Sequence, residues 1–344
     1  MKKYEHGGQI YDSAGNAGDW LDFSANINPL GLSDKILQTL QENLRGIVNY
    51  PDPNAAKLKK SILNRYEMPE KNLILLNGAS EFFYLYLNAV RPARVVIPVP
   101  TFSEYERAAR AAGCEVKYFF TNAEKNFFLD VERLKFEINP SDCVIIGRPN
   151  NPTGNLIQIE QILQLAKVAN VVIDESFIDF LDIDSIRKFA SKKISVVQSL
   201  TKIFAIPGLR LGFAVVEEDL AQKLNLSKDV WNVNFLAQKV GVAALSDEDF
   251  FIKTRAWLEI EKKFFVEQLK NLHGVKIFPP TANFILFQHE KAAEILIKLR
   301  KERILLRSCA NLIGLDNSYL RSAIRSRNEN LLLIKTLKKI LEGF

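Results

Sequence analysis

Three residues with chemically useful side chains each follow a short run of β-branched residues. Lys202 closes the sequence Ser-Leu-Thr-Lys, Asp174 opens Asp-Glu-Ser-Phe, and Asn151 lies within Asn-Asn-Pro-Thr-Gly. A lysine amine can act as a nucleophile or carry a proton, and a carboxylate can stabilise a cation beside it. Taken singly, each residue also has an ordinary explanation, because lysines are usually solvated, aspartates often cap loops, and Asn-Pro-Thr-Gly is a good turn.

Two more strand ends carry residues that suit an anion and a ring. Ala79 and Ser80 follow Gly78 in a turn that opens a helix, and backbone amides at the start of a helix can bind a phosphate. The alternative is a simple helix entry, since Gly and Ser favour turns and caps. Phe102 follows the next strand, and taken alone it would be a core residue.

Short apolar strands alternate with helical patterns through the first two thirds of the chain. The expected strands are residues 72–76, 94–98, 115–120, 142–147, 170–174, 194–199 and 211–216. Expected helices between them include residues 81–90, 104–112 and 157–168. This alternation predicts an α/β fold with a mostly parallel, doubly wound sheet, in which ligands bind beyond the carboxyl ends of the strands. The chemically useful side chains and the phosphate-binding turn should therefore meet at one edge of one sheet.

The pattern changes after about residue 225 and predicts a second, smaller lobe. Expected elements there are helices at residues 247–272, 291–302 and 328–341 and strands at residues 275–278, 284–287 and 319–324. We expect a large α/β domain at residues 43–225. Residues 1–42 together with 226–344 should form a small α+β domain with an N-terminal arm.

The composition excludes several classes of protein. The chain has 344 residues, of which 47% are apolar and 25% charged, as in soluble globular proteins. Its net charge of +6 is dispersed among 40 acidic residues without a basic block, so a nucleic-acid partner is not expected. No apolar run approaches the roughly 18 residues of a membrane span, and no secretory segment is visible, so we expect a cytoplasmic protein without membrane partners. Three scattered cysteines predict neither a metal site nor a disulfide framework.

The joint pattern resembles fold-type I pyridoxal-phosphate enzymes, specifically the class I and II aminotransferases. The matching segments are Asn-Asn-Pro-Thr-Gly at 150–154, Asp-Glu-Ser-Phe at 174–177, Ser-Leu-Thr-Lys at 199–202 and Gly-Leu-Arg-Leu-Gly at 208–212. The resemblance spans essentially the whole chain and implies pyridoxal 5'-phosphate as the cofactor. Neither GxGxxG nor the P-loop pattern occurs, so dinucleotide-binding and P-loop interpretations lose support.

This resemblance implies a task for each residue. Lys202 would attach the cofactor, and its amine would shuttle protons after the substrate has displaced it. Asp174 would face the pyridine nitrogen and keep it protonated, while Asn151 would hydrogen-bond the phenolic oxygen and Phe102 would stack on the ring. The groups implied for the cofactor phosphate are the amides of Ala79 and Ser80, the hydroxyl of Ser199 and the guanidinium of Arg210.

Two further positions bear on assembly and on the reaction. Tyr50, in Asn-Tyr-Pro, resembles the tyrosine of the family that reaches the cofactor phosphate across a dimer interface. The resemblance therefore implies a homodimer with shared active sites. Phe177 stands where many aminotransferases have a tyrosine that donates a hydrogen bond to the ring oxygen. Phe cannot donate, so the electronic tuning of the cofactor should differ from that in a simple transaminase.

The two ends of the chain narrow the resemblance to threonine-phosphate decarboxylases, relatives of the histidinol-phosphate aminotransferases. The segments that carry it are His-Gly-Gly at 6–8, Phe-Ser-Ala-Asn at 23–26, Arg-Ser-Cys-Ala-Asn at 307–311 and Leu-Arg-Ser-Ala-Ile-Arg at 320–325. The implied reaction is decarboxylation of L-threonine O-3-phosphate to (R)-1-amino-2-propanol O-2-phosphate in cobalamin biosynthesis.

The same resemblance names residues for this phosphorylated amino acid. Arg321 would bind the carboxylate, and Arg307 and His6 would bind the phosphate, because each anion favours a bidentate or charged partner. The other substrate-binding residues implied are Gly7, Asn26 and Asn151. Surface ion pairing is the ordinary alternative for the arginines, and a frayed terminus is the alternative for His6.

Two alternatives stay open at this point. An aminotransferase acting on histidinol phosphate would use the same lysine, aspartate and arginines and would differ in how the bonds at Cα are oriented. A binding module or regulator built on this fold is the alternative from another class. An absorbance band of the bound cofactor that is lost on Lys202→Ala would distinguish an enzyme from such a scaffold.

Overall fold

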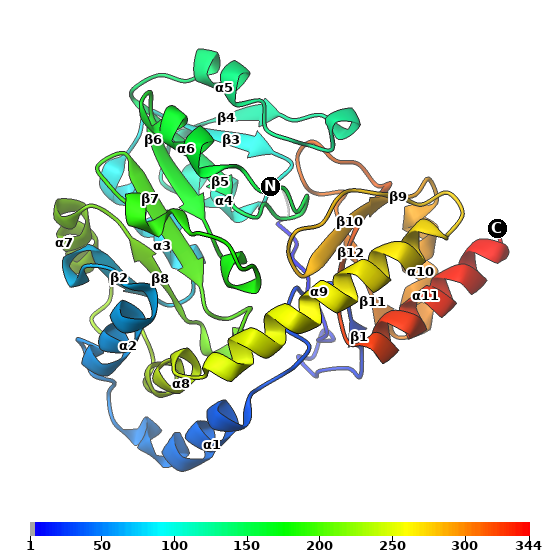
Figure 1. Cartoon of the computed structure of the whole chain (residues 1–344), viewed down its shortest axis with the longest axis horizontal. Helices are drawn as coiled ribbons and strands as arrows, with labels where there is room; N and C mark the ends of the chain where they lie inside the picture. The colour runs from blue at the N-terminus through cyan, green and yellow to red at the C-terminus, as the bar shows by residue number, and fades with distance from the viewer. Residues whose placement is uncertain (1–3) are drawn as a thin grey trace.

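A seven-stranded sheet forms the centre of the larger of two lobes (Figure 1). The computed structural model describes residues 4–344. In spatial order the strands are β2 (Leu73–Leu76), β8 (Gly212–Val215), β7 (Ile194–Ser199), β6 (Asn170–Asp174), β5 (Asp142–Gly147), β3 (Arg94–Val99) and β4 (Glu115–Phe120). Only β8 runs antiparallel to its neighbours β2 and β7, and the remaining pairs are parallel. The predicted mostly parallel α/β sheet is confirmed.

Both faces of this sheet are covered by helices, which explains its continuous apolar strands. In β6, Val171 and Ile173 belong to one apolar core and Val172 to the other, because successive side chains of a strand point to opposite faces. The helices that contribute to the Val172 core are α3 (Ser80–Val90), α4 (Glu104–Ala111) and α7 (Glu218–Ser227). The opposite core includes residues of α5 (Val131–Glu137) and α6 (Ile159–Ala166).

The smaller lobe is built around a four-stranded antiparallel sheet (Figure 1). Its strands in spatial order are β12 (Arg307–Ser308), β13 (Tyr319–Ala323), β10 (Phe284–Gln288) and β9 (Lys276–Ile277). Its helices are α9 (Glu248–Lys270), α10 (Ala292–Lys301) and α11 (Arg327–Glu342). The N-terminal segment joins this lobe, because β1 (Leu21–Asp22) pairs in parallel with β11 (Ile304–Leu305).

The remaining helices pack against one another. α8 (Phe235–Leu245) packs against both α1 (Asp34–Asn43) and α2 (Ala56–Tyr66). Helices on either side of the expected boundary at residue 225 are therefore in contact, and the division into two domains stays a prediction. Short 3-10 helices lie at Leu44–Val48, Glu70–Asn72, Ala123–Lys125, Ile178–Phe180, Ile186–Phe189 and Pro207–Leu209.

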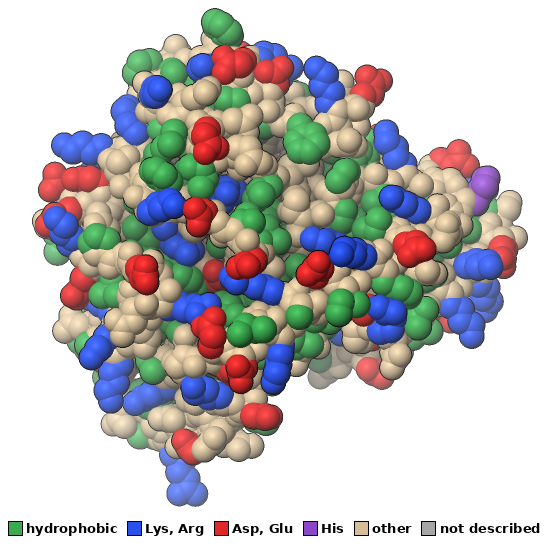
Figure 2. Space-filling view, in the orientation of Figure 1, with side chains coloured by type: hydrophobic (Ala, Val, Ile, Leu, Met, Phe, Trp, Pro, Cys, Tyr) green, Lys and Arg blue, Asp and Glu red, His purple; other side chains and the backbone are tan. Residues whose placement is uncertain are grey.

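The surface mixes charges of both signs. On the face shown in Figure 2, Lys and Arg side chains alternate with Asp and Glu across both lobes. Of the helices formed by residues 4–344, none combines the length and the apolar character needed to cross a membrane.

Candidate active site

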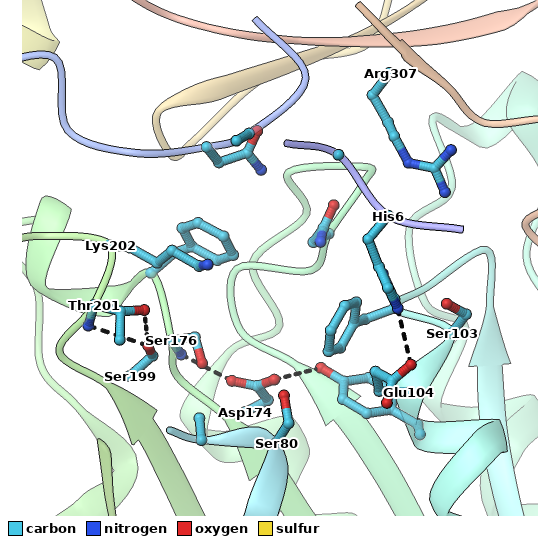
Figure 3. A pocket seen from close by; sticks show the side chains of 18 of the residues that line it. His6, Ser80, Ser103, Glu104, Asp174, Ser176, Ser199, Thr201, Lys202 and Arg307 are labelled. Carbon is cyan, nitrogen blue, oxygen red and sulfur yellow. Dashed lines mark hydrogen bonds and ion pairs between the residues drawn. The ribbon is translucent and has the colours of Figure 1, made fainter. Parts of the chain in front are cut away.

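A cavity of about 450 Å³ lies beyond the carboxyl ends of the strands of the large sheet (Figure 3). With the exception of Tyr50, the residues predicted from the sequence line it together: His6, Gly7, Asn26, Ala79, Ser80, Phe102, Asn151, Asp174, Ser199, Lys202, Arg210, Arg307 and Arg321. The strand ends of the large sheet and the turns that follow them supply the residues from position 79 to position 210. The N-terminal segment and the small sheet supply the others, so residues of both lobes line the cavity.

Lys202 extends into this cavity from the turn that follows β7. Burial lowers the pKa of its amine to about 8, and the positive charges of Arg210 and Arg321 act in the same direction. Asp174 counteracts part of this shift. A larger share of this amine is therefore neutral at physiological pH than for an ordinary lysine, and the neutral amine is the nucleophilic form.

Asp174 lies at the end of β6, and its carboxylate is held by two donors (Figure 3). Oδ2 accepts a hydrogen bond from the Tyr105 hydroxyl at 2.8 Å, and Oδ1 accepts one from the Ser176 amide at 2.9 Å. Burial raises the pKa of this carboxyl despite these hydrogen bonds and the nearby charge of Lys202. A carboxylate that has lost its water is stabilised by a cation, so this position fits the protonated nitrogen of a pyridine ring.

A cradle for a phosphate lies at the start of α3. The N-cap of this helix, Ala79, makes no side-chain capping hydrogen bond. Gly78 has a φ of +79°, and a Cβ there would lie 2.4 Å from Nη2 of Arg210, so the guanidinium rests against the turn. Ser199 Oγ and Thr201 Oγ1 are 2.8 Å apart at the same edge of the sheet. Helix amides, hydroxyls and a guanidinium are the groups that bind phosphate in proteins.

The remaining residues expected around the cofactor ring, Phe102 and Asn151, line the same cavity as Lys202 and Asp174. Phe102 packs edge-to-face on Tyr105, with ring centroids 5.6 Å apart. Asn151 Oδ1 accepts a hydrogen bond from Arg321 at 2.5 Å, which leaves its Nδ2 group as a donor. These residues fit pyridoxal phosphate: a lysine, a buried carboxylate, an amide donor, an aromatic face and a phosphate cradle occur in one cavity.

Two buried arginines stand side by side at the small-lobe side of the cavity. Arg307 and Arg321 are directly opposed in the β12–β13 pair, and each is 7% exposed. Within the part of the chain that the structure describes, neither guanidinium pairs with a carboxylate. Burial lowers the pKa of Arg321 to about 10, and the charge of Arg307 contributes to this shift. Arg321 therefore stays charged at neutral pH, and the pair is suited to two anionic groups of one ligand.

The N-terminal arm closes one side of the cavity. Gly7 crosses the backbone of Ser24 so closely that a Cβ at this position would lie 2.0 Å from the Ser24 carbonyl oxygen, and Gly8 N donates to Ser24 Oγ at 2.8 Å. Only glycine fits at position 7, and the crossing directs His6 into the cavity. Asn26 Oδ1 and Arg321 Nε are buried here without a partner among residues 4–344, as expected for groups that await a ligand.

Tyr50 lies outside the cavity of its own chain. It is 76% exposed and stacks on Trp231 with ring centroids 4.2 Å apart. The neighbouring Ile47 and Val48 are exposed as well, at 58% and 84%. An exposed aromatic residue within an apolar surface is typical of an interface. This surface is compatible with a role of Tyr50 across a dimer, which stays a prediction.

Sequence reasoning missed several residues that line the cavity, notably Ser103, Glu104 and Tyr105. They follow Phe102 directly, and Glu104 and Tyr105 begin α4. The signal that points to them is their position after a strand end, the same signal that singles out Phe102. The tasks assigned to the predicted residues stay predictions, because lining a cavity does not by itself establish a role.

Comparisons with known proteins place these observations in a family context. The family model "Aminotransferase class I and II" matches residues 18–336. Threonine-phosphate decarboxylase from Salmonella typhimurium is 35% identical over 98% of this chain and 97% of that protein. The crystal structure of L-threonine-O-3-phosphate decarboxylase from Porphyromonas gingivalis is 30% identical, with a TM-score of 0.85, over 94% of this chain and 99% of that chain. Histidinol-phosphate aminotransferase from Clostridium acetobutylicum is 32% identical, with a TM-score of 0.88, over 94% and 100%.

Proposed function

Because the chain belongs to the class I and II aminotransferase family, we propose that it uses pyridoxal 5'-phosphate to decarboxylate L-threonine O-3-phosphate to (R)-1-amino-2-propanol O-2-phosphate in cobalamin biosynthesis. The observation that carries this proposal is the buried pair Arg307 and Arg321 beside Lys202. Two guanidinium groups in one cavity favour a substrate that bears two anions, and threonine phosphate bears a carboxylate and a phosphate.

The residues that would hold the cofactor lie at the strand ends of the large sheet and in the turns that follow. Lys202 would attach it, Asp174 would face its ring nitrogen, and Phe102 would cover its ring. Its phosphate would be held by the amides of Ala79 and Ser80, the Ser199 hydroxyl and the Arg210 guanidinium. When bound, pyridoxal phosphate supplies an electron sink for the pair left at Cα.

The substrate would be held at both ends. Arg321 would bind the carboxylate, and Arg307 and His6 would bind the phosphate. The bond between Cα and the carboxyl carbon breaks, CO2 leaves, and a proton takes its place at Cα. Lys202 would carry that proton, and the lowered pKa of its amine, about 8, supports this role, because such an amine can both accept and release a proton near neutral pH.

Phe177 favours decarboxylation over transamination in this proposal. Its side chain lines the cavity and packs edge-to-face on Phe284, with ring centroids 5.0 Å apart. It cannot donate to the phenolic oxygen of the cofactor as a tyrosine would. Which bond at Cα breaks depends on which bond stands perpendicular to the ring, and two charged anchors at opposite ends of the substrate would fix that rotation.

A histidinol-phosphate aminotransferase is the second candidate function. The structural likeness to the Clostridium acetobutylicum enzyme, with its TM-score of 0.88, favours it. Arg307 and His6 would serve a phosphate in this case as well, so the cavity has the means to bind either substrate class.

A direct assay separates the two. The cofactor-loaded protein is mixed with L-threonine O-3-phosphate, and CO2 and the amino-alcohol phosphate are measured. In a parallel reaction it is mixed with histidinol phosphate and 2-oxoglutarate, and the keto product is measured. Release of CO2 supports the proposal. Ketone formation from histidinol phosphate without CO2 from threonine phosphate reverses it.

We further propose a homodimer in the cytoplasm. The exposed apolar surface around Tyr50 is its proposed interface, and Tyr50 would contribute to the partner's phosphate cradle. Cys114, Cys143 and Cys309 are all free thiols, as is usual in a reducing compartment.

A further inference from the structure

One wall of the cavity is formed by the start of α4 and the N-terminal arm, across from Lys202 (Figure 3). Ser103 and Glu104 stand on this wall, next to His6 and below Arg307. The proposed reaction assigns tasks to His6 and Arg307 and none to Ser103 and Glu104.

Glu104 fixes the position of His6. Its Oε1 accepts a hydrogen bond from His6 Nε2 at 2.9 Å, and its Oε2 accepts one from the Tyr84 hydroxyl at 3.2 Å. Arg107 lies 3.4 Å from Oε1. Burial acts to raise the pKa of this carboxyl, but the hydrogen bond and charge of His6 and the charge of Arg107 outweigh burial and lower the pKa. Glu104 is thus a buried carboxylate anchored on three side chains.

Arg307 holds the same stretch of the arm from the other side. Its Nη2 donates to the Glu5 carbonyl oxygen at 2.7 Å and to Asn311 Oδ1 at 2.7 Å. Residues 5 and 6 are therefore clamped between Arg307 and Glu104. This clamp keeps His6 and Arg307 at the same end of the cavity, where both side chains can meet one anion.

Ser103 offers a neutral donor at that end. The residue is 8% exposed, and its Oγ has no hydrogen-bond partner among residues 4–344. Buried hydroxyl groups are nearly always hydrogen-bonded, so an unpartnered one that lines a ligand cavity indicates a contact that the ligand completes.

We propose that Ser103 and Glu104 complete the phosphate-binding end of the cavity, with Ser103 donating a hydrogen bond to the substrate phosphate and Glu104 positioning His6 beside it. This inference rests on the proposed function only in that the ligand is a phosphorylated amino acid or amino alcohol. It holds for decarboxylation and for transamination alike. Ser103 is then a specificity residue, and Glu104 is a positioning residue.

The test compares variants for phosphorylated and unphosphorylated ligands. With the cofactor-loaded protein, Ser103→Ala should raise KM for threonine phosphate about tenfold at nearly unchanged kcat, the size expected for one hydrogen bond to a charged group. Ser103→Thr keeps the hydroxyl and should restore most of the loss. Inhibition by L-threonine, which lacks the phosphate, should not change in either variant.

Glu104→Gln gives a prediction opposite to simple electrostatics. Removing a negative charge beside an anion site ordinarily strengthens anion binding. The neutral amide oxygen of Gln, however, holds the His6 imidazole less firmly than a carboxylate does, which should raise KM for threonine phosphate about tenfold, again with L-threonine unaffected. Glu106→Gln is the matched control, because Glu106 is buried in the same helix and pairs with Arg110 at 2.9 Å. It should leave both ligands unchanged.

The outcomes separate the inference from the proposed function. If the wild type releases no CO2, affinities for threonine phosphate and histidinol phosphate are measured by titrating the absorbance of the bound cofactor, and the same variants decide the inference. A KM or affinity that is unchanged or improved in Glu104→Gln and Ser103→Ala overturns it. So does an equal loss for L-threonine and threonine phosphate, which would indicate a general structural effect.

Discussion

Arg307 and Arg321 occupy directly opposed positions in the antiparallel pair of β12 and β13. Residues opposed in this way project to the same face of a sheet, so one strand pair delivers both guanidinium groups to the cavity. Two like charges held side by side and buried are unfavourable without anions. The arrangement makes sense when a ligand with two anionic groups supplies them.

Substitutions of the two arginines should therefore affect ligand binding in different ways. Arg307→Ala should raise KM for threonine phosphate by about 30-fold or more, equal to about 2 kcal/mol, with little effect on inhibition by L-threonine. Arg321→Ala should weaken the binding of both ligands, because both carry the carboxylate. Arg325→Ala is the control, since Arg325 pairs with Glu329 at 2.6 Å outside the cavity. An equal response of the two ligands to Arg307→Ala would contradict the assignment of this residue to the phosphate.

Lys202→Ala should abolish both the absorbance band of the attached cofactor and turnover, with a loss of at least about 10²-fold. Lys228 offers a matched control, because burial also lowers its pKa to about 8. Its Nζ donates to the Leu75 carbonyl oxygen at 3.1 Å, away from the residues that line the cavity. Lys228→Ala should keep the band and the activity. A band that survives in Lys202→Ala would remove the basis of the proposed chemistry.

The pH dependence of cofactor uptake should report the environment of Lys202. Only the neutral amine attacks an aldehyde, and the lowered pKa of about 8 makes that form available at lower pH than for an ordinary lysine at 10.5. The rate at which cofactor-free protein takes up pyridoxal phosphate should rise with pH, with a midpoint near 8. Asp174→Asn removes the negative charge that raises this pKa, so its midpoint should move to lower pH. Stopped-flow absorbance between about pH 6 and 10 measures both, and a wild-type midpoint near 10.5 would refute the prediction.

The buried ion pair between Arg148 and Glu175 should contribute to the stability of the fold. Arg148 Nη1 lies 2.6 Å from Glu175 Oε1, and both side chains are almost fully buried. Arg148→Met removes the ion-pair partner of a buried carboxylate, which keeps its hydrogen bonds from Ser185 and the Ile186 amide and the charge of Arg187. The change should lower the free energy of unfolding by about 3 kcal/mol in urea titrations. The double variant Arg148→Met/Glu175→Leu should recover much of this loss.

Lys263→Met serves as the control for that measurement. It breaks the exposed pair between Lys263 and Glu259 and should have little effect. A single Arg148 variant as stable as the wild type would show that the buried pair contributes nothing measurable.

A shared active site can be tested by mixing two inactive variants. If Tyr50 serves the partner's cavity, a mixed dimer of Lys202→Ala and Tyr50→Ala chains contains one intact site. Co-refolded equal mixtures should then recover up to about a quarter of wild-type activity, because half of the dimers are mixed and each has one working site of two. Size-exclusion chromatography with light scattering checks that dimers form. Absence of recovery in confirmed mixed dimers would place Tyr50 outside the partner's site.

The sheet was predictable because its strands carry their own signal. Buried parallel strands read as continuous β-branched runs, and the expected bounds at residues 142–147, 170–174 and 194–199 are those observed. The antiparallel course of β8 was not predicted, since strand direction depends on the connection and not on the strand's composition. Helix α8 was not predicted either. It packs against α1 and α2 and is apolar on several sides, so it lacks the periodicity that marks an amphipathic helix.

The site was predictable where one geometric rule applied. Residues that follow parallel strands share one edge of the sheet, and this rule, together with the family resemblance, is enough to group Lys202, Asp174 and Asn151 from the sequence. This rule does not predict contacts between segments that are far apart in the sequence. The hydrogen bond from Arg321 to Asn151 joins positions 170 residues apart, and the hydrogen bond from His6 to Glu104 joins positions 98 residues apart.

The way the chain's ends meet at the cavity has a consequence for how such enzymes diversify. The residues proposed to hold the cofactor come from the central stretch of the polypeptide, whereas His6, Arg307 and Arg321 come from its beginning and its last fifth. Exchanges confined to those outer stretches could redirect the protein toward a new amino acid while the chemistry of the middle is untouched. Apart from Ser103, Glu104 and Asn151, selectivity and reactivity would then be free to evolve on separate pieces of one gene product.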